Sequence, residues 1–386
     1  MLGVRIPPGT LLARVRDNSD QGANAVPAEL GLEAEMDFAT AASKLISDKK
    51  KELWDLIGKQ EKILREDMCL HPGADHSGAI CNSHSIQQNK LQMIARAGHV
   101  YVIDLETRKL LKQPPGLAPT LLGISNTSVF RGFCSKHDEE LFRPIDTQDF
   151  KGTAEQLFLY FYRAICRELH VRHCTAKASV GPDDIARVHP DIPKHLYEEP
   201  VGEQQARFIA EALKFHLCCK SLADAALSNA EFRRLKHYII TFKSPPSVLS
   251  AAATTPTCDF SGKGYRVVSD PLHPYPIMTV TAVPTSSGGV AIMSWFDTAP
   301  VEFDRFCSSL DAVPANKLTS AIIRFLFEFC ENIAINPNWW DPLPAEHKES
   351  LLGHVRSGIT IQRTEACLAD DGICYDDWQV ERRFRL

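Results

Sequence analysis

The chain has 386 residues, of which 44% are hydrophobic and 24% charged, and its formal net charge is −5. These proportions are those of ordinary globular proteins, which excludes a largely disordered chain, and the length predicts two or three domains. The slight acidic excess argues against a protein coated with nucleic acid, and no apolar run is long enough for a membrane-spanning helix. Twelve cysteines are too few for a disulfide scaffold. We therefore expect a cytoplasmic protein without a membrane partner, in which cysteines at regular spacing are metal ligands.

The first 35 residues have neither a helical nor a strand period, and Pro7, Pro8 and Gly9 interrupt them. The string VRIPPGT resembles the translated end of a bacterial transfer-RNA gene. Two interpretations stay open, a disordered tail or an upstream extension in front of a true start at Met36. In the second case the gene would lie where prophages and genomic islands insert, and the protein would belong to a mobile element, with a role in phage defence.

The next segment, 36–68, predicts one long or two abutting amphipathic helices. Apolar residues recur at helical spacing from Phe38 to Leu64, while three lysines at 49–51 fall on the opposite face. Gly58 is a weak point in this pattern. The helical pattern ends at Met68, where a region rich in cysteine and histidine begins.

Residues 69–150 form a distinct segment with short strand and helix patterns. HVYVID, at 99–104, predicts a strand, and VFRGF, at 129–133, is its expected partner across a Pro-Pro-Gly turn at 114–116. CSKHDEELF, which starts at Cys134, predicts a helix that ends before Pro144.

Residues 151–386 predict a larger body of helices and antiparallel strands. Helices are expected over 153–175, 201–238, 302–311, 316–332 and 345–356, and strands over 238–242, 277–283 and 290–296. The last two strands flank PTSSGG, which is typical of a hairpin loop. We expect this hairpin to pack against the helix at 316–332 through Ile322, Leu326 and Phe329. The predicted fold class is α+β, with a treble-clef-like zinc module at 69–150 followed by the mixed helical and antiparallel-sheet body.

Metal-ligand spacing occurs at the start of the helix predicted after VFRGF. Cys134 and His137 are three residues apart, which places both side chains on one face of the first turn. Tetrahedral zinc needs two more ligands, which Cys69 and Cys81 could supply from the preceding loop. A knuckle, a hairpin and a helix with two ligands in its first turn make a treble-clef site. The sequence therefore predicts a structural zinc ion bound by Cys69, Cys81, Cys134 and His137.

Three histidines leave this ligand set open. His84 could replace Cys69 and would form with Cys81 a pair spaced like the pair at the helix start. His71 and His76 are further candidates. The alternative to a metal site is a group of unrelated cysteines buried as small hydrophobic side chains. The nine remaining cysteines are interpreted as core or surface thiols: Cys166, Cys174, Cys218, Cys219, Cys258, Cys307, Cys330, Cys367 and Cys374.

The predicted zinc module resembles the HNH nuclease family, whose treble-clef fold carries a histidine near the first ligand knuckle. The resemblance implies that His84, in NSHSIQ, activates a water molecule, and that a second divalent metal such as magnesium lies near the scissile phosphate. It also implies a positioning role for Asn126 and makes His137 the second histidine, which competes with its role as a zinc ligand. The Gly-rich stretch and the proline that follow the first histidine in the family are missing here.

The favoured interpretation is a non-catalytic, zinc-stabilised recognition or interaction protein whose partner is a protein or a nucleic acid. The strings GHVYVID, GFCSKHDEELF and ENIAINPNWWDPL resemble those of bacterial proteins that carry no assigned activity. The chain has no phosphate-binding P-loop, dinucleotide fingerprint or nucleophile elbow. The alternative is a metal-dependent nuclease in which His84 is the catalytic base.

Overall fold

The computed structural model describes residues 65–103, 118–178, 201–264, 277–299, 301–359 and 366–386, with isolated positions between 55 and 63. The extension at 1–35, most of the helix predicted over 36–68 and the Pro-Pro-Gly turn at 114–116 lie outside the described residues. The inference that the gene lies beside a transfer-RNA gene therefore stays a prediction from the sequence.

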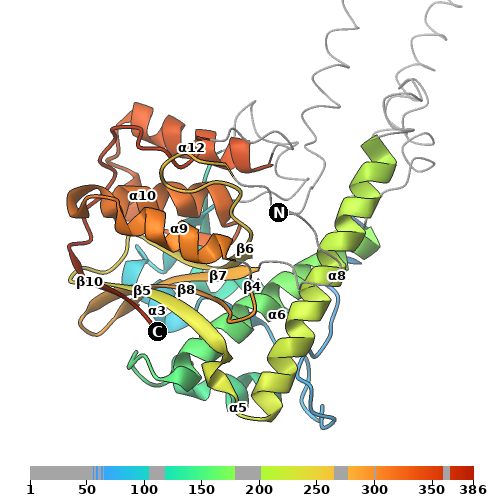
Figure 1. Ribbon diagram of the computed structural model, residues 1–386. Coiled ribbons are helices and arrows are strands. Elements are labelled where there is room, and N and C mark those ends of the chain that lie inside the picture. Colours follow the sequence, from blue (N-terminus) through green and yellow to red (C-terminus); the bar gives the residue numbers. More distant parts are fainter. Residues whose placement is uncertain are drawn as a thin grey trace, which may run out of the picture.

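An antiparallel sheet forms the centre of the described structure (Figure 1). Its eight strands follow the order β10-β5-β8-β7-β6-β9-β2-β3, and every neighbouring pair is antiparallel. The strands are β2 (His99–Val102), β3 (Thr120–Gly123), β5 (Leu235–Phe242), β6 (Val248–Thr254), β7 (Met278–Thr285), β8 (Gly288–Phe296), β9 (Ile333–Ile335) and β10 (Val380–Arg385). Two strands from the segment 69–150, β2 and β3, thus lie in the same sheet as the strands of the body.

Helices cover both faces of this sheet, as Figure 1 shows. One layer contains α9 (Glu302–Asp311), α10 (Ala315–Phe329) and α12 (Ala345–Ile359). The other contains α3 (Gln88–Ile94), α5 (Ser135–Asp146), α6 (Ala154–Ala178) and α8 (Val201–Ser228). Besides these longer helices, the described residues form three short ones: η1 (Ile124–Asn126), η3 (Phe232–Arg234) and α11 (Pro337–Trp340). Among the described residues, no helix is long and apolar enough to cross a membrane.

Two hydrophobic cores result, one on each face of the sheet. Strand β8 serves both, because Met293 and Trp295 pack with α9 and α10, whereas Val290 and Ile292 lie in the core that contains α6. A strand covered on both faces is apolar at consecutive positions rather than at alternate ones, which is why β7 and β8 were recognisable as strands.

The predicted α+β class and the hairpin are confirmed. Strands β7 and β8 pair from Thr279 with Ser294 to Thr285 with Gly288, so a two-residue turn at 286–287 joins them. Gly288 has a φ of 142°, and a Cβ there would lie 2.0 Å from the carbonyl oxygen of Phe242, so only glycine fits. The predicted contact residues of α10, Ile322, Leu326 and Phe329, are buried in the core that also contains Met293.

The predicted partner of the strand at 99–104 is wrong. Strand β2 pairs with β3 on one side and with β9, more than 200 residues later, on the other. Val129 and Phe130 form β4 instead, which pairs with β1 (Ser83–His84) in a separate two-stranded sheet. Strand content is a local property of the sequence, whereas the choice of partner depends on distant segments.

Two predicted helix ends are also wrong. The helix expected over 201–238 ends at Ser228, because Ala230 adopts a positive φ of 52° and Glu231 donates a backbone hydrogen bond back to Ala226. Helix α5 does not end before Pro144 but continues to Asp146. Pro144 lies in its last turn, where the helix loses only one backbone hydrogen bond.

Candidate metal centre

A short extended segment at 131–135 brings the metal-binding candidates together. It leaves β4 and enters α5, and neighbouring segments bind its backbone on both sides. The amide of Leu70 donates to the carbonyl of Gly132 at 2.9 Å, and the amide of Cys81 donates to Phe133 at 3.0 Å. Because both neighbours are fixed to this segment, the chain around Cys69 lies beside the start of α5.

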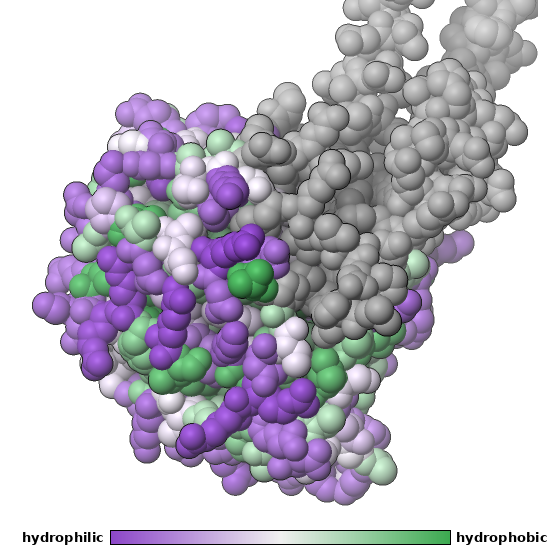
Figure 2. Space-filling model, in the orientation of Figure 1, coloured by the Kyte–Doolittle hydropathy of each residue, from purple (hydrophilic) through white to green (hydrophobic). Residues whose placement is uncertain are grey.

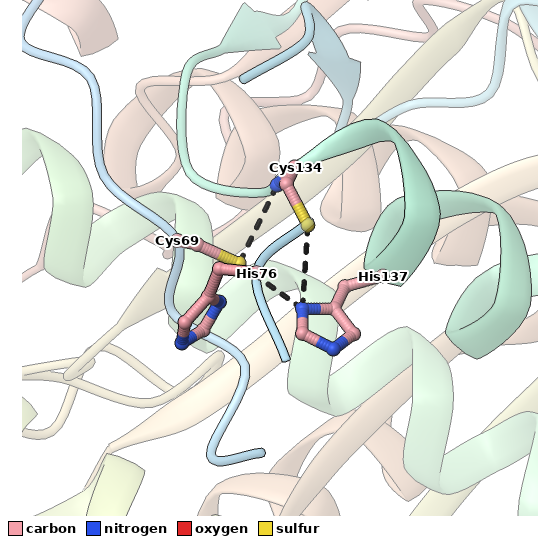
Figure 3. A group of neighbouring side chains, drawn as sticks. All are labelled: Cys69, His76, Cys134 and His137. Atoms are coloured by element: carbon pink, nitrogen blue, oxygen red, sulfur yellow. Dashed lines mark hydrogen bonds between the residues drawn. The ribbon is translucent and has the colours of Figure 1, made fainter. Parts of the chain in front are cut away.

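The side chains of Cys69, His76, Cys134 and His137 form a cluster whose ligand atoms all lie within 4.8 Å of one another (Figure 3). The Nδ1 atom of His137 lies 3.4 Å from the sulfur of Cys69 and 3.3 Å from that of Cys134. The backbone amide of Cys134 also donates to the Cys69 sulfur, at 3.4 Å. This cluster could hold a metal ion, with two thiolates and two imidazoles as donors.

The cluster is partly protected from water. Cys134 and His137 are buried at the start of α5, Cys69 is half-buried, and His76 is exposed. Burial raises the pKa of the Cys69 thiol and lowers the pKa of His137. Both shifts favour the uncharged forms, and binding of a metal must therefore displace the thiol protons.

His71 lies next to the cluster as a support for one ligand. Its ring stacks on that of His137, with centroids 3.8 Å apart and 15° between the planes. Its Nδ1 atom accepts a hydrogen bond from the amide of Gly73 at 3.0 Å. The stacking restricts the tilt of the His137 ring, whose Nδ1 atom lies near both sulfur atoms.

The structure places the predicted ligands in two groups. Cys69, Cys134 and His137 lie in the cluster, and His76, one of the further candidates, joins them. Cys81 lies outside: its sulfur contacts the carbonyl oxygen of Phe133 at 3.5 Å and the hydroxyl of Ser83 at 3.6 Å. The sequence signal for His76 was its place in a glycine-containing loop, where a side chain can turn back toward Cys69.

His84 and Asn126, the residues singled out by the HNH resemblance, lie near each other but outside the cluster. His84 is on β1, and its Nε2 atom lies 3.3 Å from the carbonyl oxygen of Ile124. Asn126 is exposed at the end of η1, two residues farther along the chain. Burial lowers the pKa of His84 and raises that of the neighbouring Asp138.

Helices α6 and α8 hold the loop that carries Cys69, a contact the sequence did not reveal. The Nζ atom of Lys220 donates to the carbonyl oxygen of Leu70 at 2.7 Å and pairs with Asp224. Tyr162 donates to the same carboxylate at 2.6 Å, and the Lys220 ammonium lies 5.0 Å from the centre of its ring. The backbone next to a candidate ligand is therefore fixed to the interior of the molecule.

The basic residues on α6 are already engaged within the protein. Arg163 binds both carboxylate oxygens of Asp146, at 2.6 and 2.7 Å. Arg167 and Arg172 pair with the buried Glu168, at 3.1 and 2.7 Å. These charges stabilise the packing of α6, which explains their position in the sequence without a bound phosphate.

Comparison with known protein families, curated proteins and solved structures found no match to this chain.

Proposed function

We propose that the chain is a recognition or interaction protein whose N-terminal part is folded around one structural zinc ion, bound by Cys69, His76, Cys134 and His137. The observation that carries the proposal is the convergence of four zinc-type donors within 4.8 Å. Two cysteines with two histidines are a common donor set for structural zinc, and the mixture of sulfur and nitrogen disfavours magnesium or calcium.

The number of protein donors supports a structural role for the metal. A tetrahedral ion with four side-chain ligands has no position left for a water molecule or a substrate, whereas catalytic zinc keeps one. The ion would connect a loop at 69–76 with the first turn of α5, which belong to different backbone segments. Such a connection would add to the apolar packing of this loop, in which Cys69 and Leu70 pack against the core that contains α6.

The order of the elements supports a treble-clef-like arrangement. Ligands from a loop come first, the paired strands β1 and β4 follow, and the start of α5 then contributes two ligands, Cys134 at the N-cap and His137 in the first turn. The loop ligands Cys69 and His76 are seven positions apart, so the loop is wider than a usual zinc knuckle.

The surface supports recognition through polar contacts. On the face drawn in Figure 2, hydrophilic side chains cover most of the described surface, and hydrophobic ones form small separate groups. A broad apolar surface would favour an obligate protein partner, whereas a polar surface suits a partner, protein or nucleic acid, that binds and dissociates.

Metal analysis of single-residue variants tests the zinc site. We expect one zinc ion per chain in the purified protein, and loss of that zinc in His76→Ala and Cys134→Ser, with lower thermal stability because structural zinc contributes to folding. Cys81→Ser is the matched control, since the Cys81 sulfur lies outside the cluster. The proposal fails if the protein contains no zinc and added zinc leaves its melting temperature unchanged, or if Cys81→Ser loses the metal while His76→Ala retains it.

The second candidate function is a metal-dependent nuclease. The observation that favours it is the position of His84 on β1, the strand that follows the loop with Cys69 and His76, since the HNH resemblance implies a catalytic histidine near the first ligand knuckle. The half-buried ring and the contact of Nε2 with a backbone carbonyl favour a structural role for His84 instead.

A further inference from the structure

We propose that Cys258 and Cys367 form an oxidation site, at which hydrogen peroxide converts two thiols into a reversible disulfide. The two sulfur atoms lie 3.0 Å apart, although 109 positions separate them in the chain. A disulfide has a sulfur–sulfur distance of about 2.05 Å, so formation of the bond requires a movement of about 1 Å. This pair is separate from the metal cluster, whose sulfur atoms both contact His137.

The loop that carries Cys258 is rigid. Next to the cysteine, the Oδ1 atom of Asp259 accepts hydrogen bonds from the amides of Ser261 and Lys263, at 2.9 and 3.1 Å. The backbone of Asp259 is also bonded to Lys263 and Gly262. These bonds fix the direction of the Cys258 side chain, which is 1% exposed.

The turn that carries Cys367 packs directly against this loop. Gly262 has a φ of 80°, and a Cβ placed on it would lie 3.5 Å from Ala366 and 3.6 Å from Ala369. The amide of Ala369 donates to the carbonyl of Ala366 and closes the turn around Cys367. The contact between these two backbone segments brings the two thiols to a sulfur–sulfur distance of 3.0 Å.

The two thiols differ in their access to a small oxidant. Cys367 is 7% exposed and Cys258 only 1%. The Cys367 thiolate attacks one peroxide oxygen, which breaks the O–O bond, gives a sulfenic acid and releases the first water. The Cys258 sulfur then attacks the sulfenic sulfur and releases the second water. Two thiols and one hydrogen peroxide thus yield one disulfide and two waters, with two electrons passing from sulfur to peroxide.

The disulfide would attach the segment that ends in β10 to the loop after β6. Residues 366–386 contain the edge strand β10, which among the described strands pairs with β5 alone. A covalent link across a long loop restricts the unfolded chain, so the oxidised protein should resist unfolding better than the reduced one. Oxidation would therefore stabilise the C-terminal segment without altering the metal site.

Peptide mapping of the full chain tests this proposal. The purified protein is treated with hydrogen peroxide, its remaining thiols are blocked with N-ethylmaleimide under denaturing conditions, and it is digested with trypsin. We expect peptides 244–263 and 364–382 to be joined, with a mass two hydrogens below the sum of the two peptides when Cys374 carries N-ethylmaleimide, and to separate after treatment with dithiothreitol. The melting temperature should rise by about 5 °C in the oxidised protein.

Two variants make the assignment specific. Peptide 364–382 also contains the exposed Cys374, so Cys374→Ala is the background in which the link must persist. Cys367→Ala must abolish the link and the rise in melting temperature. The proposal is overturned if the wild-type peptides stay separate at a peroxide dose that oxidises the exposed Cys218, or if the link is lost in Cys374→Ala. The wild-type map decides the question even if Cys367→Ala does not fold.

Discussion

His84 separates the two candidate functions, because its ring is held by a backbone carbonyl rather than by the metal cluster. In a non-catalytic protein, His84→Ala should retain zinc and lose about 1 kcal/mol of stability with the hydrogen bond to Ile124. If His84 is a catalytic base, the same variant should keep its zinc and its fold but lose metal-dependent plasmid cleavage by about 100-fold or more.

The control for His84→Ala is a variant of an exposed histidine that makes a similar contact with a backbone carbonyl. His99 is exposed and its Nδ1 atom lies 2.8 Å from the carbonyl of Ala97, so His99→Ala should change neither zinc content nor stability appreciably. We expect no cleavage of plasmid by the wild-type protein with magnesium or manganese. Cleavage that disappears in His84→Ala and persists in His99→Ala would establish the nuclease and refute the non-catalytic proposal.

His237 should make stability depend on pH. It lies on β5, 4% exposed, with Nδ1 2.8 Å from the hydroxyl of Ser294, and burial lowers its pKa to about 4. Above its unfolded pKa, about 6.5, both states are neutral and the full stability is present. As pH falls from 6.5 toward 4, the unfolded chain takes up the proton first, so stability is lost in that range.

The expected size of the effect is measurable by denaturant unfolding. Between pH 7 and pH 5 the wild-type protein should lose about 2 kcal/mol through this group. The His237→Gln variant should be less stable than the wild-type protein at pH 7. Between pH 7 and pH 5, its loss of stability should be smaller than that of the wild-type protein by about 2 kcal/mol. Equal losses in both proteins would show that His237 contributes nothing to the pH dependence. Both proteins retain the metal ligands, so the contribution of these ligands to the pH dependence cancels when the two stability losses are subtracted.

At the residue scale, the sequence indicated the two donors at the helix start. Cys134 is the N-cap of α5 and His137 lies in its first turn, so their three-residue spacing brings both side chains to the same end of the helix. The position of His76 depends on a loop whose course is set by hydrogen bonds to residues about 60 positions later, such as that from Ser135 to Ala79. Sequence spacing carries no information about such a bond, and for that reason Cys81 was as reasonable a candidate as His76.

At the scale of elements, α8 should act on the metal site through Lys220. The Lys220 ammonium binds the carbonyl of Leu70, directly after Cys69 in the chain. Lys220→Met removes this bond and the ion pair with Asp224, while the bond from Tyr162 to Asp224 remains. Residues that orient ligands typically change metal affinity by about 10- to 100-fold when they are lost, and we expect a decrease of that size.

Competition with a chromophoric chelator measures the zinc affinity. Lys236→Met is the matched control, since Lys236 makes an exposed ion pair with Asp304 at 3.2 Å, and it should leave the affinity unchanged. Loss of folding stability in Lys220→Met with unaltered zinc affinity would assign Lys220 to helix packing alone.

The elements that could be predicted are those with an apolar helical period or a run of β-branched and aromatic residues. Strand β6, VLSAAAT, was missed because alanine and serine carry little strand preference, although all seven of its residues are buried. Strand β10, VERRFR, was missed because an edge strand keeps charged side chains in solvent and so lacks an apolar strand pattern. Three-residue β9 is too short to have a period at all.

At the scale of the whole molecule, the fold joins its first and last parts through the sheet. Strand β9 lies between β6 and β2, and within the described part of the sheet it is the strand that connects β2 and β3 to the others. Asn332, just before β9, extends the same connection: its side chain bonds to Ser85 and Ser128, near β1 and β4, and to the carbonyl of Ala251 on β6. This connection joins the segment with the candidate metal ligands to the body of the protein. The α+β class of the fold could be predicted from the sequence, but this connection could not.

The position of β9 also determines the order in which parts of the chain can fold during synthesis on the ribosome. All four candidate ligands have been synthesised by residue 137, so a zinc ion could bind while most of the chain is still missing. Strands β2 and β3 must then wait for residues 333–335 before they can join the sheet. At about 5–20 residues per second, that interval of about 200 residues lasts roughly 10–40 s. During this time the unpaired edge of β2 is open to other nascent chains, and early zinc binding would shorten the stretch of polypeptide that is exposed to mispairing.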